Sequence, residues 1–88
     1  MRAVTIYTTS YCGYCVRAKS ILTQQAVPYV DHDVTNDDAK RQWLVDTTGS
    51  RTVPQIFFGD EPIGGCDDLE ALVRSGRLKE RLATPPAP

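Results

Sequence analysis

Residues 10–20 read SYCGYCVRAKS and place Cys12 and Cys15 three positions apart, with a helix-favouring stretch directly after them. From Cys15 onward, apolar residues recur at helical spacing, which predicts a helix over residues 12–25. Directly upstream, residues 3–8 (AVTIYT) alternate as a strand does and are rich in β-branched and aromatic residues. The two cysteines are therefore predicted to lie where the first strand gives way to the first helix.

The rest of the chain continues this alternation. Turn signals and apolar periodicity predict strands over 29–33, 55–58 and 61–64, and helices over 37–49, 67–76 and 78–82. The order β-α-β-α-β-β-α indicates an α/β fold class. One domain is expected over residues 1–82, followed by a flexible, proline-rich tail over residues 83–88 (ATPPAP).

The number of cysteines limits what the C-x-x-C pair can be. Three cysteines are an odd number for a fully paired disulfide framework, and zinc sites usually combine two close pairs of ligands. Beyond Cys12 and Cys15, the chain offers only Cys66 and the single histidine, His32, far apart in the sequence. The spacing of Cys12 and Cys15 alone is also compatible with zinc binding or with a structural role. At a strand-to-helix junction, however, the pair is typical of a thioredoxin-like redox motif, and redox chemistry is the favoured interpretation.

The composition is that of a small globular protein. The chain has 88 residues, of which 41% are hydrophobic and 24% charged, and its formal net charge is −1. This balance provides no global field for nucleic acid or anionic lipid, so neither is an expected partner. No apolar run approaches a membrane span, and the first residues lack a signal-peptide pattern, so a cytoplasmic localisation is predicted.

The start of a helix favours a reactive sulfur. Unpaired backbone N–H groups of Tyr14 and Cys15 can donate to the Cys12 sulfur, and the helix dipole favours a thiolate there. Arg17 and Lys19 are expected to add positive charge. Because a stabilised thiolate is a good leaving group, Cys12 is the predicted nucleophile, and Cys15 is predicted to close an internal disulfide with it. The simpler interpretation of Cys15 is a small buried hydrophobe.

Three further residues have simple interpretations. Cys66 has no close cysteine partner and is interpreted as non-catalytic. His32 lies in a predicted strand between two aspartates and is interpreted as solvated. Trp43, at helical spacing, is interpreted as a core residue.

Three blocks of sequence, YTTSYCGYC (7–15), RTVPQIFF (51–58) and IGGCDDL (63–69), occur in the order and spacing of the glutaredoxins. The chain resembles this family, most closely the small bacterial glutaredoxin 3 subgroup, over nearly all of residues 3–82. The resemblance implies a thioredoxin fold with a four-stranded mixed sheet flanked by helices. It also implies glutathione-dependent reduction of protein disulfides and protein–glutathione mixed disulfides through Cys12 and Cys15.

The resemblance further implies a glutathione site. The Val53 backbone, before a cis Pro54, would pair with the cysteinyl part of glutathione as an added strand does. Asp67 at a helix start would meet the γ-glutamyl end. The full set of implied glutathione-binding residues is Tyr14, Arg41, Thr52, Val53, Pro54, Gly65 and Asp67.

Two positions depart from the family pattern, since Gly13 stands where many glutaredoxins have proline, and Thr9 where they have lysine. The C-G-Y-C sequence is also similar to the mycoredoxins, which use mycothiol. A mycoredoxin-like protein, an electron donor fed by thioredoxin reductase and a thioredoxin-fold domain without turnover are therefore alternatives. A further alternative is a dimer bridged by a [2Fe–2S] cluster on Cys12 of each chain and two glutathione thiols. Without such a cluster the protein is expected to be a monomer with no metal.

Overall fold

The computed structural model describes residues 1–83 and contains every predicted strand and helix. The elements are β1 (Val4–Thr8), α1 (Gly13–Gln24), β2 (Val30–Asp33), α2 (Asp38–Thr48), β3 (Gln55–Phe58), β4 (Glu61–Gly64), α3 (Cys66–Arg74) and α4 (Leu78–Ala83). The predicted tail begins at Ala83, which closes α4, and its remaining residues, 84–88, lie outside the described part of the chain.

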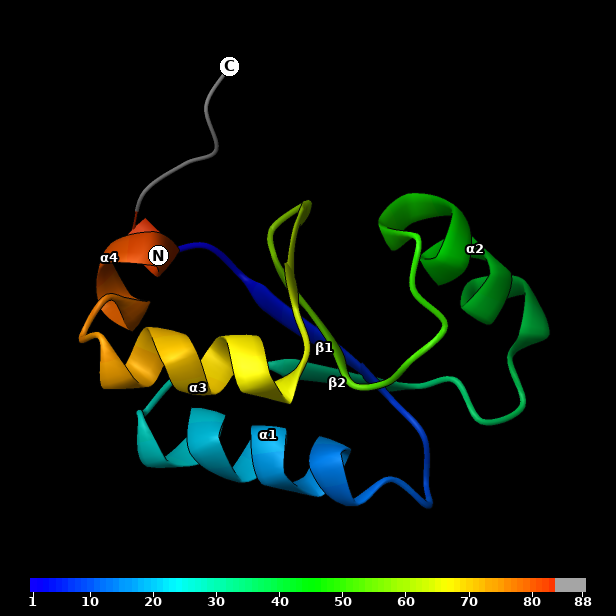
Figure 1. Cartoon of the computed structure of the whole chain (residues 1–88), viewed down its shortest axis with the longest axis horizontal. Helices are drawn as coiled ribbons and strands as arrows, with labels where there is room; N and C mark the ends of the chain where they lie inside the picture. The colour runs from blue at the N-terminus through cyan, green and yellow to red at the C-terminus, as the bar shows by residue number, and fades with distance from the viewer. Residues whose placement is uncertain (84–88) are drawn as a thin grey trace.

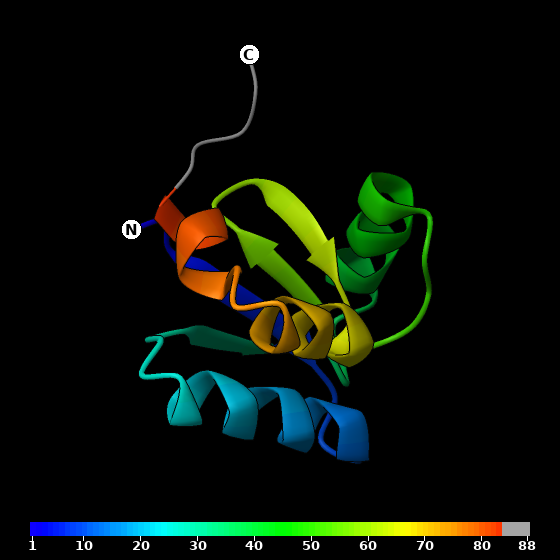
Figure 2. The same ribbon diagram turned by 60° about the vertical axis from the view of Figure 1, so that its left-hand side comes forward.

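The four strands form one mixed sheet in the spatial order β2-β1-β3-β4. β1 pairs in parallel with β2 and antiparallel with β3, which pairs antiparallel with β4. The parallel pair needs a crossover, which α1 supplies, whereas a tight turn joins β3 to β4. α1 and α3 lie side by side on one face of the sheet, and α2 lies on the other (Figures 1 and 2). This is the predicted thioredoxin fold.

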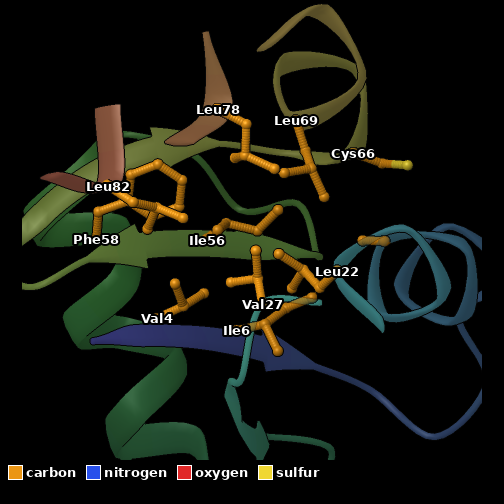
Figure 3. Close-up of a cluster of buried hydrophobic side chains, with 11 residues drawn as sticks. Val4, Ile6, Leu22, Val27, Ile56, Phe58, Cys66, Leu69, Leu78 and Leu82 are labelled. Atoms are coloured by element: carbon orange, nitrogen blue, oxygen red, sulfur yellow. The ribbon is translucent and has the colours of Figure 1, made fainter. Parts of the chain in front are cut away.

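The larger part of the core lies between the sheet and the helices α1, α3 and α4. Alternate positions of β1 and β3 point into it, so that Ile6, Ile56 and Phe58 are fully buried (Figure 3). Leu22 of α1 and Leu69 of α3 pack against them. Because α1 packs on the two inner strands, β1 and β3, the start of α1, where both cysteines lie, has a fixed position.

The smaller cluster lies on the opposite face of the sheet, where Leu44 of α2 packs with Tyr7 and Phe57. The prediction that Trp43 is a core residue is wrong, since 40% of its surface is exposed. Its ring stacks on Phe57 at a centroid distance of 5.6 Å, and the Lys40 ammonium lies 4.5 Å from its centre. Because α2 turns Leu44 toward the sheet, Trp43, one position earlier, covers the margin of the cluster instead of entering it.

Ala26 follows the last turn of α1 and has a φ of +58°, in the left-handed region. We expect Ala26→Gly to raise the free energy of unfolding by about 1 kcal/mol, because glycine adopts this conformation without the steric cost that an L-residue carries. Ala26 is exposed, so the change removes no packing. Urea denaturation measures the effect. The control is Ala71→Gly, at an exposed position inside α3, which should lower the same free energy. A loss of stability at both positions would contradict the prediction.

Candidate active site

Cys12 is the N-cap residue of α1, and its sulfur takes the place of the usual N-cap oxygen. The backbone N–H of Cys15 donates to the Cys12 sulfur at 3.1 Å, as the helix-start argument predicts. The Cys12 thiol in turn donates to the carbonyl oxygen of Val53, 3.6 Å away. The sulfur is half-buried and lies between the positive end of α1 and the loop before β3. A thiolate formed there has a hydrogen-bond donor already in place.

Cys15 lies behind Cys12, one turn into α1, and only 1% of its surface is exposed. Burial, together with a hydrogen bond to Cys12, raises the pKa of the Cys15 thiol to about 12. A backbone hydrogen bond from Thr9 and the positive charge of Lys19 act on this pKa in the opposite direction. Cys15 is therefore a buried, protonated thiol next to the half-buried Cys12 sulfur, and it must lose its proton before it can attack a disulfide.

The positive charges expected beside Cys12 are paired with carboxylates. The Arg17 guanidinium binds the Glu70 carboxylate of α3 at 2.9 Å. Lys19 binds the Asp31 carboxylate of β2 at 2.8 Å. Arg17 and Lys19, which the sequence predicts to add positive charge, are thus both held in ion pairs. The first turn of α1 is the electrostatic support that the Cys12 sulfur receives directly.

An open cleft of about 750 Å³ is lined by Tyr14, which stands between the two cysteines in the sequence, and by Val53. The carbonyl oxygen of Val53 connects it to the Cys12 thiol. Six of the seven predicted glutathione-binding residues line this cleft, namely Tyr14, Thr52, Val53, Pro54, Gly65 and Asp67. The fold therefore brings together residues from α1, from the loop before β3 and from the start of α3.

Arg41, the seventh predicted residue, does not line this cleft. It lies on α2 beside a smaller depression of about 330 Å³, which shares Thr52 and Val53 with the cleft. Arg51 lines the same depression. Sequence reasoning missed Arg51, although it stands inside the RTVPQIFF block directly before Thr52. Two guanidinium groups therefore lie at one end of the site.

The loop before β3 and the turn before α3 approach each other closely at the cleft. The Val53–Pro54 peptide bond is cis, as the resemblance implies. A methyl group on Gly65 would come within 3.4 Å of the Pro54 carbonyl oxygen, so a larger side chain at position 65 would press against this loop. A glycine at this position therefore allows the two segments to lie close together.

The two aspartates at the start of α3 have different surroundings. Asp68 accepts a hydrogen bond from the Gly65 backbone N–H at 2.9 Å and so caps the helix. It also fills the space beside Gly64, where φ is +121° and a Cβ atom would overlap the Asp68 side chain. Asp67 is exposed, and within residues 1–83 it makes no hydrogen bond or ion pair. Asp67 is therefore the carboxylate that is available to a ligand in the cleft.

The sequence matches the Glutaredoxin family over residues 4–63. The chain belongs to the glutaredoxin family. This glutaredoxin is 45% identical over 86 residues to a probable glutaredoxin of Synechocystis sp., covering 97% of this chain and 79% of the relative. It is 44% identical over 82 residues to glutaredoxin 3 of Escherichia coli, covering 93% and 99% of the two chains. Family and fold together make it a thiol–disulfide oxidoreductase.

Solved glutaredoxin structures share its fold. The solution structure of glutaredoxin from Brucella melitensis has a TM-score of 0.86 and 38% identity, covering 100% of this chain and 96% of that one. The crystal structure of a buckwheat glutaredoxin–glutathione complex has a TM-score of 0.85 and 34% identity, covering 92% and 76%. This glutaredoxin therefore has the architecture of the family over its described length.

Cys66, the third cysteine, is the first residue of α3 and is buried. Burial and a hydrogen bond to Glu70 raise the pKa of its thiol to about 11. The interpretation of Cys66 as non-catalytic stays a prediction from the sequence.

No resident metal site is built by the described part of this glutaredoxin. Residues 1–83 contain no group of three or more His, Cys, Asp or Glu side chains placed to hold a metal ion. A cluster bridging two chains through Cys12 stays a prediction from the sequence. Among the helices in this range, none has the length and apolar character needed to cross a membrane.

Proposed function

We propose that this glutaredoxin reduces protein disulfides and protein–glutathione mixed disulfides, with glutathione as the electron donor and Cys12 and Cys15 as the redox couple. The observation that carries the proposal is the position of the Cys12 thiol, which reaches the Val53 carbonyl at the edge of the large cleft. Six residues that the family resemblance assigns to glutathione line that cleft. The structurally similar buckwheat glutaredoxin is described as a glutathione complex, which gives further support.

Each part of glutathione has a chemically suited group in the cleft. The cysteinyl part would pair with the Val53 backbone, which places its sulfur next to Cys12. The γ-glutamyl carboxylate would meet the N-terminus of α3, and its ammonium the free Asp67 carboxylate. The glycine carboxylate would lie toward Arg41 and Arg51 at the other end.

The proposed reaction with a mixed disulfide uses Cys12 alone. The Cys12 thiolate attacks the glutathione sulfur, the protein thiolate leaves and takes up a proton, and glutathione remains bound to Cys12 as a mixed disulfide. The thiolate of a second glutathione attacks that same glutathione sulfur. This step expels the Cys12 thiolate and forms glutathione disulfide from the substrate's own glutathione and one free glutathione, whose sulfur is oxidised as the protein sulfur is reduced.

The proposed reaction with a protein disulfide uses both cysteines. Cys12 attacks one sulfur of the disulfide, and the Cys15 thiolate then attacks the Cys12 sulfur and releases the reduced protein. Two glutathiones reduce the resulting Cys12–Cys15 disulfide in turn. Because this cycle depends on a pool of reduced glutathione, we propose that the protein acts in the cytoplasm. We also propose that it acts as a monomer, since each step uses the cysteines of one chain.

The decisive experiment offers three electron donors separately, with a small mixed disulfide of the corresponding thiol as substrate. The donors are glutathione with its reductase, mycothiol with its reductase, and thioredoxin reductase with NADPH. Turnover with glutathione alone is the expected result. Turnover only with mycothiol, or only with thioredoxin reductase, would mean that this donor and not glutathione supplies the electrons. No turnover with any donor would leave a thioredoxin-fold domain without this activity.

Asp67→Ala is expected to raise the KM for glutathione about fivefold and to leave kcat at saturation nearly unchanged. The carboxylate would hold a remote ammonium equally in the ground state and the transition state, which is uniform binding. Steady-state kinetics with varied glutathione measures both constants. The control is Asp60→Ala, an exposed aspartate on the β3–β4 turn that lines neither depression, with both constants unchanged. An unchanged KM in Asp67→Ala would move the γ-glutamyl site elsewhere.

A further inference from the structure

A chain of three polar side chains links α1 to the ends of β1 and β2. The Lys19 ammonium binds one oxygen of the Asp31 carboxylate at 2.8 Å. The Thr8 hydroxyl donates to the other oxygen at 2.6 Å. The Thr8 side chain is buried, whereas about a third of the Lys19 and Asp31 side-chain surface is exposed. Both oxygens of Asp31 are therefore engaged, and the Lys19 ammonium has a fixed position.

The same lysine is a helix neighbour of the second redox cysteine. Lys19 follows Cys15 by four residues on α1, so that the two side chains are neighbours on the same helix face. The backbone N–H of Thr9, next to Thr8, also donates to the Cys15 sulfur. The charged groups that act most strongly on this sulfur are Cys12 and Lys19, and Lys19 is the cation of the two.

Cys15 needs such a cation because its thiol is hard to ionise. Burial is the first cause that raises the pKa of the Cys15 thiol, whereas the hydrogen bond and charge of Cys12 no longer act on it once Cys12 carries a mixed disulfide. Because only the thiolate attacks a disulfide, the rate of the internal attack depends on how well the site stabilises this minor form. Mixed-disulfide reduction by the second glutathione does not involve Cys15 and is independent of it.

We infer that Lys19, held in place by Asp31 and Thr8, is the charge that stabilises the Cys15 thiolate while it closes the Cys12–Cys15 disulfide. This inference rests on the proposed function, since it assumes that Cys12 carries the mixed disulfide. In the step, the Cys15 thiol gives its proton to solvent, and its thiolate attacks the Cys12 sulfur. The bond between Cys12 and the substrate sulfur breaks, and the departing thiolate takes up a proton. The substrate sulfur is reduced, and the two cysteines are oxidised to a disulfide.

A chromogenic disulfide separates the two steps in one recording. The reduced protein, in a Cys66→Ser background, is mixed with the symmetric disulfide of thionitrobenzoate. Attack by Cys12 releases the first coloured thiolate, and attack by Cys15 on the resulting mixed disulfide releases the second. The first phase therefore reports Cys12, and the second reports Cys15. The rate of each phase is recorded across a range of pH.

Lys19→Met is expected to slow the second phase and to leave the first phase unchanged. Each unit rise in the Cys15 pKa lowers its thiolate fraction tenfold but raises its nucleophilicity about threefold, so the net loss is about threefold. The second-phase profile should move toward higher pH by a corresponding amount. Lys19→Arg, which keeps the charge, should restore the rate. The matched control is Lys79→Met. Lys79 is an exposed lysine on α4 whose ammonium donates to the Gln25 carbonyl oxygen, and its loss should change neither phase.

Asp31→Asn distinguishes an electrostatic role of Lys19 from a purely structural role of the Lys19–Asp31 ion pair. The amide still accepts from Thr8 and Lys19 but leaves the ammonium unneutralised, so the second phase should be as fast as in the wild type or faster. If the second phase of Asp31→Asn were slowed as much as that of Lys19→Met, the ion pair would only hold α1 in position, and the inference would be overturned. An unchanged second phase in Lys19→Met, or equal slowing of both phases, would also overturn it. A wild-type protein without a first phase would refute the proposed function itself, whereas a normal first phase with an insensitive second phase refutes the inference alone.

Discussion

Cys12→Ser is expected to lose turnover of glutathione mixed disulfides by a factor of about a thousand or more, because a serine hydroxyl is barely ionised near neutral pH and cannot form the intermediate disulfide. Both proposed reactions begin with attack by the Cys12 sulfur, so both should be lost together. A coupled assay with glutathione and its reductase measures the first reaction. Reduction of a disulfide-containing protein, followed through the new thiols, measures the second.

The fold of the Cys12→Ser variant should survive, because serine is among the preferred N-cap residues and can accept the Cys15 N–H in place of the sulfur. Its melting temperature is therefore expected to equal or exceed that of the wild type. Cys66→Ser is the matched control, since it replaces another cysteine and should keep full activity. Substantial activity in Cys12→Ser would remove Cys12 as the nucleophile.

The elements of this fold are predictable from local sequence because each is marked by its own periodicity and its own boundary. The alternation of residues 3–8 and the helical spacing after Cys15 give β1 and α1 within one residue of their observed ends. The spatial order β2-β1-β3-β4 does not follow from such patterns, because the partner of a strand is set by contacts between distant segments. Only the resemblance supplied the four-stranded mixed sheet in advance.

The candidate site divides in the same way. The bond from the Cys15 N–H to Cys12 was predictable, since both residues lie in one helical turn. The ion pairs of Arg17 and Lys19 were not, because Glu70 and Asp31 lie on other elements, and sequence spacing contains no information on such pairs. For this reason, the sequence predicts the positive charges of Arg17 and Lys19 but not the carboxylates that pair with them.

The start of α3 shows a subtler limit. In sequence, Asp67 and Asp68 are adjacent acids with equal claims on the first turn of a helix. The direction of the chain at Gly64 and Gly65 decides between them, since it turns Asp68 back onto the Gly65 N–H and leaves Asp67 free. Adjacent identical residues thus acquire different roles from one backbone turn.

Cys15→Ser is expected to keep deglutathionylation and to lose reduction of protein disulfides by a factor of about a hundred or more. Removal of glutathione from a protein needs only Cys12 and a second glutathione. Reduction of a protein disulfide leaves a bulky partner on Cys12, and the internal attack by Cys15 acts at a high effective concentration that a glutathione from solution does not reach. The same two assays, run side by side on one preparation, give the ratio of the two activities.

This ratio is the informative quantity, because a damaged fold would lower both activities together. Cys15 is fully buried and serine is the closest isostere available, although its hydroxyl enters a site where a thiol now bonds to Cys12. The melting temperature of Cys15→Ser is therefore measured alongside the kinetics, to show that the variant is folded. Equal loss of both activities in a stably folded variant would mean that Cys15 supports the Cys12 sulfur instead of attacking it. Equal retention of both would mean that glutathione alone resolves every mixed disulfide on Cys12, and the second cysteine would then be the small buried hydrophobe that its spacing also permits.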